Sequence, residues 1–386
     1  MSASRIVIAT GGTAGHVAPA LAVADALRAD GAEVTFIGGD RAERELVPRA
    51  GYPLRELSVE GLSRSNPLRA ARALGRAALA LPRAIGLLRE LRPDAVLGGG
   101  GYVAGPVGLA ALGLRIPLVL SEADSHLGVT NRLLAPAARR VCLAFPLADR
   151  DGARYRVTGR PVRPADTDRA SARAHFGIAP EQTCVLVFGG SLGARSINLA
   201  ALDGLAELVR AGAPAGAGVR VGPAAGAGAE DAPPTPPGEG AVRVLHIAGR
   251  RDHAELSARA LPAGYDLREY LELEQFAQAL AAADLVVARS GGSVFEIAAC
   301  GLPAILIPYP HASADHQSAN ARWMADAGAA VVIPDGELSA ERLTGEVAEL
   351  LADRPRRAAM ARASSALARP EAAREVAGEL LRAAGA

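Results

Sequence analysis

Short apolar runs alternate with glycine-rich turns and helix-forming segments along most of the chain. The first such group is the run Ile6–Ala9, a turn over residues 10–16 and an amphipathic segment over Val17–Arg28. Continuous apolar runs of this length are typical of strands in a parallel sheet that is covered on both faces. Strands that alternate with helices predict an α/β fold of doubly wound parallel sheets, which bind ligands at the carboxyl ends of their strands.

The same pattern begins twice, which indicates two domains of similar design. In the N-terminal half we predict further strands at Val34–Ile37, Ala95–Leu97, Pro117–Leu120, Val141–Phe145 and Tyr155–Val157. In the second half we predict strands at Cys184–Phe188, Val242–Ile247, Asp266–Tyr270, Leu285–Ala288 and Ala304–Pro308. Residues 159–164 have the composition of a linker, so we place the boundary between a domain 1–160 and a domain 161–367. Residues 211–240 are almost wholly Ala, Gly and Pro and predict a flexible insertion.

The composition narrows the class of protein. The chain has 386 residues, 50% of them hydrophobic, and a net charge of +1, so it can bury two cores and gives no electrostatic case for binding nucleic acid. Its three cysteines lie in apolar segments, as expected for buried thiols in a reducing compartment. The first strand begins almost at once, and no apolar run reaches the ~20 residues that span a bilayer. We therefore expect a soluble or peripheral protein without a secretory signal.

Residues 61–89 have an unusual charge pattern. They contain six arginines and no acidic residue, interleaved with leucine and isoleucine. A basic amphipathic surface of this kind suits an anionic membrane interface. The alternative is a pair of ordinary surface helices in an arginine-rich protein, and the sequence leaves both interpretations open.

The turn over residues 10–16 is the first candidate binding element. It contains Gly11, Gly12 and Gly15, and such turns bring backbone N–H groups close to an anion or a sugar phosphate. It lacks the G-x-G-x-x-G spacing of dinucleotide-binding turns. His16 follows at the start of a helix, where the helix dipole opposes protonation and leaves the imidazole available as a base. A capping or packing histidine is the alternative.

Two later strand ends of the N-terminal half also carry candidate groups. Residues 98–101 are four consecutive glycines, which cost backbone entropy unless the chain turns sharply or approaches another group closely, and Tyr102 follows them. Glu122 and Asp124 lie just after the strand Pro117–Leu120 and are candidates for binding or general-base catalysis. Asn131 opens the helix after them.

The C-terminal half contains two more turns of this type. Residues 189–193, with Ser191, precede a helix and form a second phosphate-type loop. Residues 290–293 precede a short helix whose first turn holds Glu296, a carboxylate that can accept two hydrogen bonds from a vicinal diol such as a ribose. Gln317 and Asn320 offer donors and acceptors that suit sugar hydroxyls. An ordinary strand–helix–strand unit with a solvated glutamate is the alternative.

Four of these stretches, in this order, resemble one protein family. They are GGTAGHVAPALAVADAL, GGGGYVAGP, GGSLGARSIN and RSGGSVFEIAACGLPAILIPYPHASADHQSANA. The family is the bacterial peptidoglycan glycosyltransferase that makes lipid II from lipid I. Each motif alone is weak, but four in order are specific, and the resemblance covers nearly the whole chain except residues 211–240.

The resemblance implies a metal-independent, inverting glycosyltransferase of the GT-B class, with two doubly wound, Rossmann-like domains that face each other across a cleft. It implies transfer of GlcNAc from UDP-GlcNAc to the 4-hydroxyl of the MurNAc of lipid I, undecaprenyl-pyrophosphoryl-MurNAc-pentapeptide. It further implies no cofactor, no metal and no nucleic acid, and a peripheral position on the anionic cytoplasmic face of the cell membrane. A final helix at about 368–386 is expected to pack back on the N-terminal domain.

The resemblance also implies roles for individual residues. His16 and Glu122 would be catalytic, and Tyr102 and Asn131 would face the lipid acceptor. In the donor site, the Leu271 backbone would contact the uracil and Glu296 the ribose. The residues implied to contact the diphosphate are Arg163, Ser191, Gly292 and Ser293. The GlcNAc hydroxyls would be contacted by Gln317 and Asn320. The donor site would be completed from the N-terminal side by Thr13, Ala14, Gly15 and Asp124.

Two positions depart from the family pattern. Ala14 stands where many members have Gly, and Asp124 stands where the family usually has Asn. The segment between Gly291 and Glu296 is also one residue shorter than usual. These departures keep two alternatives open: a GT-B glycosyltransferase that acts on a different lipid or natural-product acceptor, and a non-catalytic sugar-nucleotide-binding protein of the cell envelope.

Overall fold

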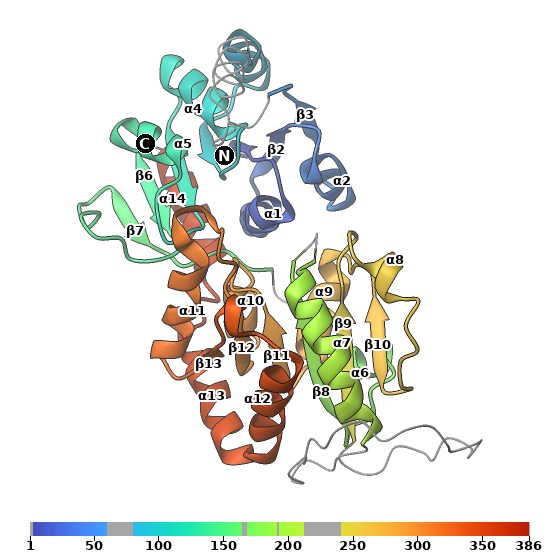
Figure 1. Ribbon diagram of the computed structural model, residues 1–386. Coiled ribbons are helices and arrows are strands. Elements are labelled where there is room, and N and C mark those ends of the chain that lie inside the picture. Colours follow the sequence, from blue (N-terminus) through green and yellow to red (C-terminus); the bar gives the residue numbers. More distant parts are fainter. Residues whose placement is uncertain (1–2, 60–79, 164–167, 191–192, 212–240, 386) are drawn as a thin grey trace. The chain divides into compact units, whose positions relative to one another are not determined.

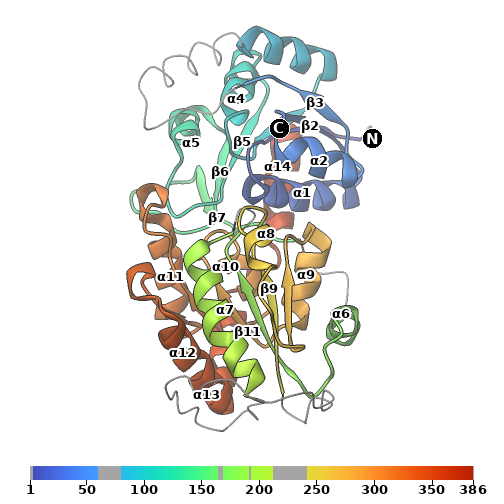
Figure 2. The ribbon, with the colours of Figure 1, turned by 45° about the vertical axis from the view of Figure 1, so that its right-hand side comes forward.

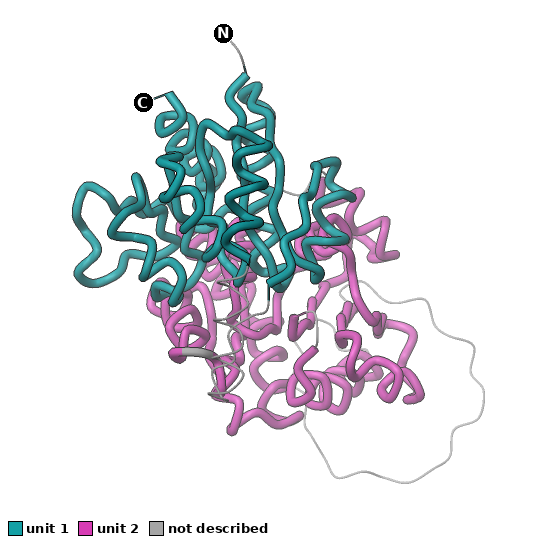
Figure 3. The backbone as a smooth tube through the Cα atoms, turned by 90° about the horizontal axis from the view of Figure 1, so that it is seen from above, with its two compact units in different colours: residues 1–163, 369–386 teal, residues 164–368 magenta. Residues whose placement is uncertain are grey.

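Two all-parallel sheets, each wound in the same strand order, organise the chain in the computed structural model (Figure 1). The structure describes residues 3–59, 80–163, 168–190, 193–211 and 241–385. It divides into unit 1, residues 1–163 and 369–386, and unit 2, residues 164–368 (Figure 3). The division falls three residues after the boundary expected from the linker composition, and the final helix belongs to unit 1.

The sheet of unit 1 has seven strands in the order β3-β2-β1-β4-β5-β6-β7. Strand order reverses between β1 and β4, whose register pairs Ile6 with Ala95 and Ala9 with Gly98. The carboxyl ends of these two strands therefore form the topological switch point of the sheet. The strands are β1 (Arg5–Ala9), β2 (Glu33–Gly38), β3 (Leu54–Glu56), β4 (Ala95–Gly98), β5 (Leu118–Glu122), β6 (Arg140–Leu143) and β7 (Tyr155–Val157).

Helices cover both faces of this sheet. On one face, α4 and the helical residues 80–91 pack over Val7, Val96 and Leu118. Elsewhere in the unit, α1 packs on α14, and α14 contacts β4 and β5. The helices of unit 1 with printed bounds are α1 (Ala14–Ala29), α2 (Ala42–Arg49), α4 (Ala104–Gly113), α5 (Val129–Leu134), the 3₁₀ turn η1 (Ala135–Ala137) and α14 (Ala372–Ala384).

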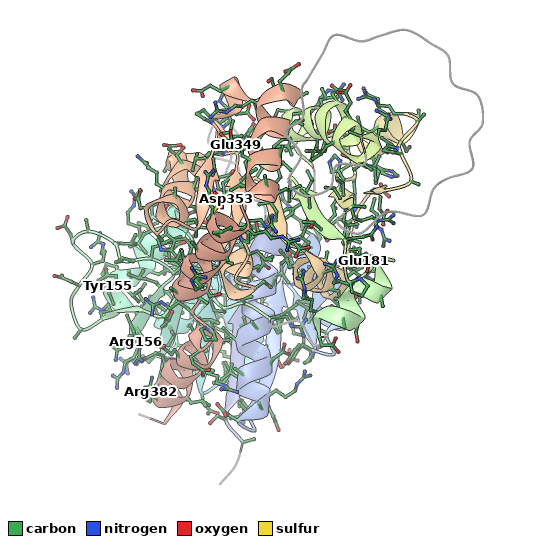
Figure 4. All side chains as sticks on the ribbon, turned by 90° about the horizontal axis from the view of Figure 1, so that it is seen from below. Tyr155, Arg156, Glu181, Glu349, Asp353 and Arg382 are labelled. Carbon is green, nitrogen blue, oxygen red and sulfur yellow. The ribbon has the colours of Figure 1, made fainter. Side chains whose placement is uncertain are left out.

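The last helix completes unit 1 although it lies far along the sequence. It buries Val376, Ala377, Leu380 and Ala383, a spacing that places these side chains on one face. Its Glu379 accepts hydrogen bonds from Arg140 Nε of β6 at 2.9 Å, Arg156 Nη1 of β7 at 3.0 Å and its own Arg382 at 2.9 Å. Figure 4 labels Arg156 and Arg382 at this helix.

The sheet of unit 2 repeats the winding with six strands in the order β10-β9-β8-β11-β12-β13. Its switch point lies between β8 and β11, where Phe188 pairs with Ala288. The two glycine turns predicted for this half therefore follow the carboxyl ends of two neighbouring central strands. The strands are β8 (Thr183–Phe188), β9 (Val242–Ile247), β10 (Tyr265–Arg268), β11 (Leu285–Ala288), β12 (Ala304–Leu306) and β13 (Ala330–Val332).

The core of unit 2 lies between this sheet and the helices that include α7 and α12, which pack against each other (Figure 2). Leu205 of α7 and Val347 of α12 are fully buried with Val185 and Val287 of the sheet. The helices are α6 (Arg169–His175), α7 (Arg195–Arg210), α8 (His253–Leu256), α9 (Leu273–Ala282), α10 (Val294–Ala299), η2 (Ser313–Asp315), α11 (His316–Asp326), η3 (Asp335–Glu337), α12 (Ala340–Ala352) and α13 (Arg354–Leu367).

The predicted fold class of two doubly wound parallel sheets is confirmed, and the main differences lie at the sheet edges. The short strands β3 and β13 were not predicted, and neither was α2. β5 runs on to Glu122, so that this carboxylate lies on the strand itself. The predicted insertion 211–240 lies outside the described residues, apart from Ala211 at the end of α7.

The basic segment 61–89 is described only from residue 80. In that part Ala80, Ala84 and Leu88 are buried in the core of unit 1, while Arg83 and Arg89 are exposed. The apolar side chains of this described part therefore pack in or against the core of unit 1. Among the described helices, none has the length and apolar character needed to cross a membrane.

Candidate functional site

The candidate site of unit 1 is built on two glycine loops at its switch point. The loop after β1 and the loop after β4 touch, because a Cβ on Gly101 would overlap the carbonyl oxygen of Gly11. A Cβ on Gly100 would come within 2.9 Å of His16 Nδ1. Both Gly100 and Gly101 also have positive φ, at 89° and 79°. The expectation that the four glycines serve a sharp turn and a close approach is confirmed.

Glu43 of α2 holds these loops together from beneath. Its fully buried carboxylate accepts hydrogen bonds from Gly12 N at 2.9 Å, Gly39 N at 2.8 Å and the Tyr102 hydroxyl at 3.0 Å. Burial, followed by the charge of Glu43, raises the pKa of Tyr102. Tyr102, predicted to face the acceptor, thus uses its hydroxyl inside the protein, and its ring edge lies beside Gly12.

His16 lies in the first turn of α1, as predicted, with its N–H bonded to Thr13 O at 3.0 Å. Burial lowers the pKa of the His16 imidazole. Asp124 and Glu43 oppose this shift, and Arg160 adds to it. The imidazole is therefore neutral around pH 7 and able to take a proton.

Arg160 joins the loop that carries His16 to the loop that carries Asp124. Its guanidinium donates to the carbonyl oxygens of Gly15 and Ala123, the latter at 3.3 Å, and only 6% of the residue is exposed. These carbonyls follow β1 and β5, which are separated by β4 in the sheet. A buried cation in this position fixes the spacing of His16 and Asp124.

The Glu122 carboxylate forms its hydrogen bonds within the loop that follows β5. Its oxygens accept hydrogen bonds from Gly128 N at 2.8 Å, Asn131 Nδ2 at 2.9 Å and Asp124 N at 3.2 Å. Burial raises the pKa of Glu122, and these hydrogen bonds oppose the shift. The structure brings Glu122, Asp124 and Asn131 together, as expected of neighbours at one strand end, but it encloses Glu122 and Asn131, which are 6% and 4% exposed.

Arg163 lies at a different part of unit 1 from His16. Its Nε donates to Asp25 Oδ2 at 2.8 Å, and the Tyr52 hydroxyl donates to the other oxygen of Asp25 at 2.8 Å. Asp25 is nine residues along α1 from His16, which corresponds to roughly 13 Å of helix. Arg163, expected at the diphosphate, is thus placed in an ion pair on the side of α1.

The candidate site of unit 2 begins with the loop after β8. Gly190 and Gly193 have positive φ, at 92° and 79°, and Gly193 packs so closely on the carbonyl of Ala248 that a side chain would overlap it. α7 follows directly, so its first turn presents backbone N–H groups at the switch point. Ser191, predicted to contact the diphosphate, lies outside the described residues.

The start of α7 is tied to β9 by a buried polar chain. Asn198 donates to Ala248 O at 2.9 Å and to Asp252 Oδ2 at 3.0 Å, and its carbonyl oxygen lies 3.1 Å from His246 Nε2. His246 Nδ1 lies 2.8 Å from the Tyr265 hydroxyl. Burial lowers the pKa of His246 to about 3, so this histidine is a neutral part of the fold.

The loop after β11 is held by α11. Asn320 donates to the carbonyls of Ser290 and Gly291 at 3.0 and 3.4 Å, and the Ser290 hydroxyl donates to Gln317 O at 2.8 Å. Asn320 is only 1% exposed, so the structure places it beneath the turn and not at a sugar-facing surface. Gln317 accepts from Tyr309 N at 3.0 Å and keeps its amide nitrogen near Gly291.

The remaining predicted donor residues surround the same turn or the end of β10. Ser293 is the N-cap residue of α10, after Gly292, and Glu296 lies in the first turn of that helix, as predicted. Leu271 buries its side chain just before the N-cap of α9. The preceding residue is Tyr270, and the Arg250 guanidinium carbon lies 4.4 Å from the centroid of its ring.

Arg289 is the buried centre of this half and was not predicted. Its guanidinium donates to Asp335 at 2.6 Å, to the Ser196 hydroxyl at 2.9 Å and to the carbonyl of Ile307 at 3.1 Å. It therefore ties the end of β11 to the end of β12 and to the first turn of α7. Its position as an arginine directly between the apolar run Leu285–Ala288 and the glycine turn was a signal available in the sequence.

Glu43 and Arg160 were also missed. Glu43 follows a strand and the pair Gly38-Gly39, and Arg160 lies in the segment assigned to a linker. Within the described ranges, no group of three or more His, Cys, Asp or Glu side chains is placed to hold a metal ion.

Comparison with known proteins gives the same division into two halves. Residues 6–143 match the glycosyltransferase family 28 N-terminal domain, and residues 184–376 match its C-terminal domain. The chain is 43% identical, over 95% of its length and 96% of the relative's, to the UDP-N-acetylglucosamine–N-acetylmuramyl-(pentapeptide) pyrophosphoryl-undecaprenol N-acetylglucosamine transferase of Moorella thermoacetica. It is 41% identical to the protein of that name from Methylococcus capsulatus, over 100% of both chains.

A solved structure agrees with these matches. MurG of Acinetobacter baumannii superposes with a TM-score of 0.70 at 27% identity, covering 99% of this chain and 100% of that one. The two doubly wound units and this neighbour place the fold in the GT-B class. The chain is a member of glycosyltransferase family 28.

Proposed function

We propose that this glycosyltransferase catalyses the reaction for which its relatives are named. It transfers N-acetylglucosamine from UDP-GlcNAc to N-acetylmuramyl-(pentapeptide) pyrophosphoryl-undecaprenol, lipid I, and so forms lipid II. The structural observation that carries the proposal is His16, a histidine with a depressed pKa between two interlocked glycine loops at a switch point. A hydroxyl acceptor needs a base of this kind, whereas a purely binding protein does not.

On the acceptor side, His16 removes the proton. The 4-hydroxyl oxygen of the muramyl sugar attacks the anomeric carbon of GlcNAc, its proton passes to the imidazole, and the bond between that carbon and the UDP oxygen breaks with inversion. His16 Nδ1 faces Gly100, so Nε2 is the nitrogen that receives the proton. Asp124 stabilises the imidazolium that forms.

Glu122 acts in this proposal as a positioning residue. Its three hydrogen bonds within the loop of residues 122–131 fix Asp124 and Asn131. Thr13 is exposed at the N-cap of α1, and Ala14 and Gly15 begin that helix, so their N–H groups are available to a phosphate or a hydroxyl. Tyr102 supports the first loop through Glu43.

On the donor side, unit 2 holds UDP-GlcNAc. The first turn of α7 supplies backbone N–H groups for the diphosphate, together with Ser191 and with Gly292 and Ser293 at the start of α10. Glu296 accepts from the ribose hydroxyls, and the backbone of Leu271 contacts the uracil. The Gln317 amide nitrogen faces the sugar, while Asn320 shapes the turn from below.

We propose that no resident metal ion is required. The departing UDP gains negative charge, and the dipole of the 16-residue helix α7 and the N–H groups of the glycine loops can stabilise that charge. Turnover should then persist in the presence of EDTA.

We also propose that unit 1 contacts the cytoplasmic face of the membrane. α4 and α5 pack together through Gly108 and Leu134 and expose Leu109 (54%), Val129 (39%) and Leu133 (73%), close in sequence to the exposed Arg132. Exposed apolar side chains beside a cation suit an anionic lipid surface. Leu109→Ser with Leu133→Ser should reduce co-sedimentation with anionic vesicles, whereas unchanged co-sedimentation would exclude these helices as the contact.

The reaction is tested by UDP release. Wild-type protein should release UDP from UDP-GlcNAc only when a lipid I analogue is added. If UDP release requires a different lipid or natural-product acceptor, lipid I is not the acceptor, but the assignment as a glycosyltransferase stands. Tight binding of UDP-GlcNAc without turnover of any lipid acceptor would favour the non-catalytic alternative.

A further inference from the structure

A pocket of about 520 Å³ opens in unit 1 beyond the loop that carries His16. It lies at the carboxyl ends of β2 and β3, and its volume is within the range of small-ligand sites. The lining residues are Gly39, Asp40, Arg41, Glu56, Leu57, Ser58 and Val59. None of these residues has a role in the proposed transfer reaction.

The pocket and the candidate acceptor site are connected through Tyr102. The Arg41 guanidinium carbon lies 5.2 Å from the centroid of the Tyr102 ring. A Cβ on Gly39 would collide with the Tyr102 hydroxyl, so the pocket floor and this side chain touch. On its other side, a Cβ on Gly12 would lie 3.9 Å from Tyr102 and 3.8 Å from the His16 ring. The Tyr102 side chain therefore lies between the His16 ring and the pocket floor, and an extension of a ligand at His16 has to pass Tyr102 to enter the pocket.

The order of strands sets the length of that extension. β2 is the neighbour of β1, and β3 is the next strand outward. Adjacent strands are about 4.8 Å apart, so the pocket lies on the order of 5–10 Å from the strand end that leads to His16. A substituent of the acceptor sugar has to span this distance to occupy it.

The charges of the pocket select among the parts of the acceptor. Arg41 and Asp40 are exposed, and within the described part of the chain neither is held in an ion pair. Glu56 is 3.5 Å from Arg44, with both side chains more than half exposed. Two carboxylates repel a pyrophosphate, and a polar rim does not suit a polyprenyl chain. A peptide ends in a carboxylate and donates through its backbone N–H groups, so it matches a site that offers one cation and two acidic acceptors.

We propose that this pocket binds the peptide arm of the acceptor. Arg41 pairs with a peptide carboxylate, and Asp40 and Glu56 accept from peptide N–H groups. The inference rests on the proposed acceptor, an N-acetylmuramyl-(pentapeptide) pyrophosphoryl lipid. It makes the pocket a specificity site, separate from the groups that move the proton.

Two synthetic acceptors test the inference. One is an N-acetylmuramyl-pentapeptide pyrophosphoryl lipid with a shortened chain, and the other is the same molecule without the peptide. The wild-type kcat/KM should be about tenfold higher for the peptide-bearing acceptor, as one charge-assisted contact allows. In Arg41→Ala and in Asp40→Asn this ratio should fall toward one. Arg139 is exposed just before β6, toward the far side of the same sheet, and Arg139→Ala should keep the wild-type ratio.

Each outcome has a distinct meaning. Equal kcat/KM for the two acceptors in wild type, or a ratio that survives both substitutions, would overturn the pocket assignment and leave the transfer reaction intact. Failure of wild type to use either acceptor would overturn the proposed function and this inference with it. Thermal unfolding of Arg41→Ala and Asp40→Asn should match wild type, because both side chains are exposed.

Discussion

His16 combines a lowered pKa with neighbours of both charge signs, and this combination decides its behaviour. We expect His16→Asn to lower kcat by about 10²–10⁴-fold, the usual contribution of a general base. The dissociation constant for UDP-GlcNAc should stay nearly unchanged, because we propose that unit 2 supplies most of the donor contacts. Single-turnover kinetics and a calorimetric titration with UDP-GlcNAc measure the two quantities. If the His16→Asn protein kept the wild-type kcat, His16 would not be the general base.

The two charged neighbours of His16 should move its pKa in opposite directions. A base works when it is deprotonated, so kcat/KM falls as the pH drops through the His16 pKa, which lies below the ordinary 6.5. Arg160→Met removes a cation, favours the imidazolium and moves this acid limb to higher pH. Asp124→Asn removes an anion and moves it to lower pH. The pH profiles of kcat/KM test both shifts, and shifts of the same sign in the two variants would refute the assignment.

At this scale the sequence predicts the groups that follow a strand directly. His16, Glu122 and Asp124 were found because strand ends and glycine turns are local patterns. Glu43 and Arg160 were not, because their partners are distant: Glu43 bonds Gly12 from 31 residues away, and Arg160 bonds Gly15 across 145. Only the folded sheet brings these residues together. The burial of Glu122 and Asn320 was missed for the same reason.

Among the elements, the switch point of unit 2 depends on one buried cation. Arg289 joins β11, β12, α7 and Asp335, with its side chain 11% exposed and that of Asp335 22% exposed. We expect Arg289→Met to lower the free energy of unfolding of unit 2 by roughly 3 kcal/mol, because it leaves the Asp335 carboxylate without its cation. Urea unfolding can be followed by fluorescence of Trp323, the chain's single tryptophan, which packs on Phe295 in this unit.

Two further variants make this experiment decisive. The double variant Arg289→Met with Asp335→Asn should recover part of the loss, since it removes the stranded charge. Arg342→Met removes an i,i+4 pair with Glu346 in which the arginine side chain is 53% exposed, and should cost about 0.5 kcal/mol or less. If Arg289→Met were no more destabilising than Arg342→Met, the cation would not organise the switch point.

Central elements were predictable, and edge elements were not. β11 is apolar throughout, and β1 and β8 are apolar after their first residue, because both faces are covered, so these strands stand out in the sequence. β3 contains Leu54, Arg55 and Glu56 at a sheet edge, where one side faces solvent and the pattern is mixed. α2 was missed although its Glu43 fixes the first loop.

In the whole molecule, the main contact between segments far apart in the sequence is the packing of α14 on unit 1. The Glu379 side chain is 4% exposed and forms salt bridges with Arg140, Arg156 and Arg382. Glu379→Gln should lower the opening free energy of this helix by about 1–3 kcal/mol. Hydrogen exchange of peptides from β6 and α14, read by mass spectrometry, measures that change. Glu371→Gln, at the N-cap of the same helix with its side chain 58% exposed, is the matched control and should change little.

The effect of Glu379 should also depend on pH. Burial alone would raise its pKa, but hydrogen bonds from Arg382 and Arg140 outweigh burial, and the folded pKa lies below the ordinary 4.5. A depressed carboxyl pKa stabilises the folded state above the unfolded pKa, and this contribution is lost as the pH falls below about 4.5. The gap between wild type and Glu379→Gln should therefore close in acid, and a gap that widened there would contradict the ion-pair account.

The division of the molecule could be predicted from composition to within three residues, because linkers differ from covered strands in composition. That α14 joins unit 1 was expected only from family resemblance. Its amphipathic spacing shows that it must be covered, but not by which sheet.

The transfer of GlcNAc to lipid I can be tested by following both products of the reaction. The most direct measurement is the mass of the lipid product, with UDP counted in the same reaction, in the presence of EDTA. We predict that a lipid I analogue gains one N-acetylhexosamine for each UDP released, and that His16→Asn suppresses both signals together. UDP release without a mass gain on the lipid, or a mass gain only on another acceptor, would contradict the account.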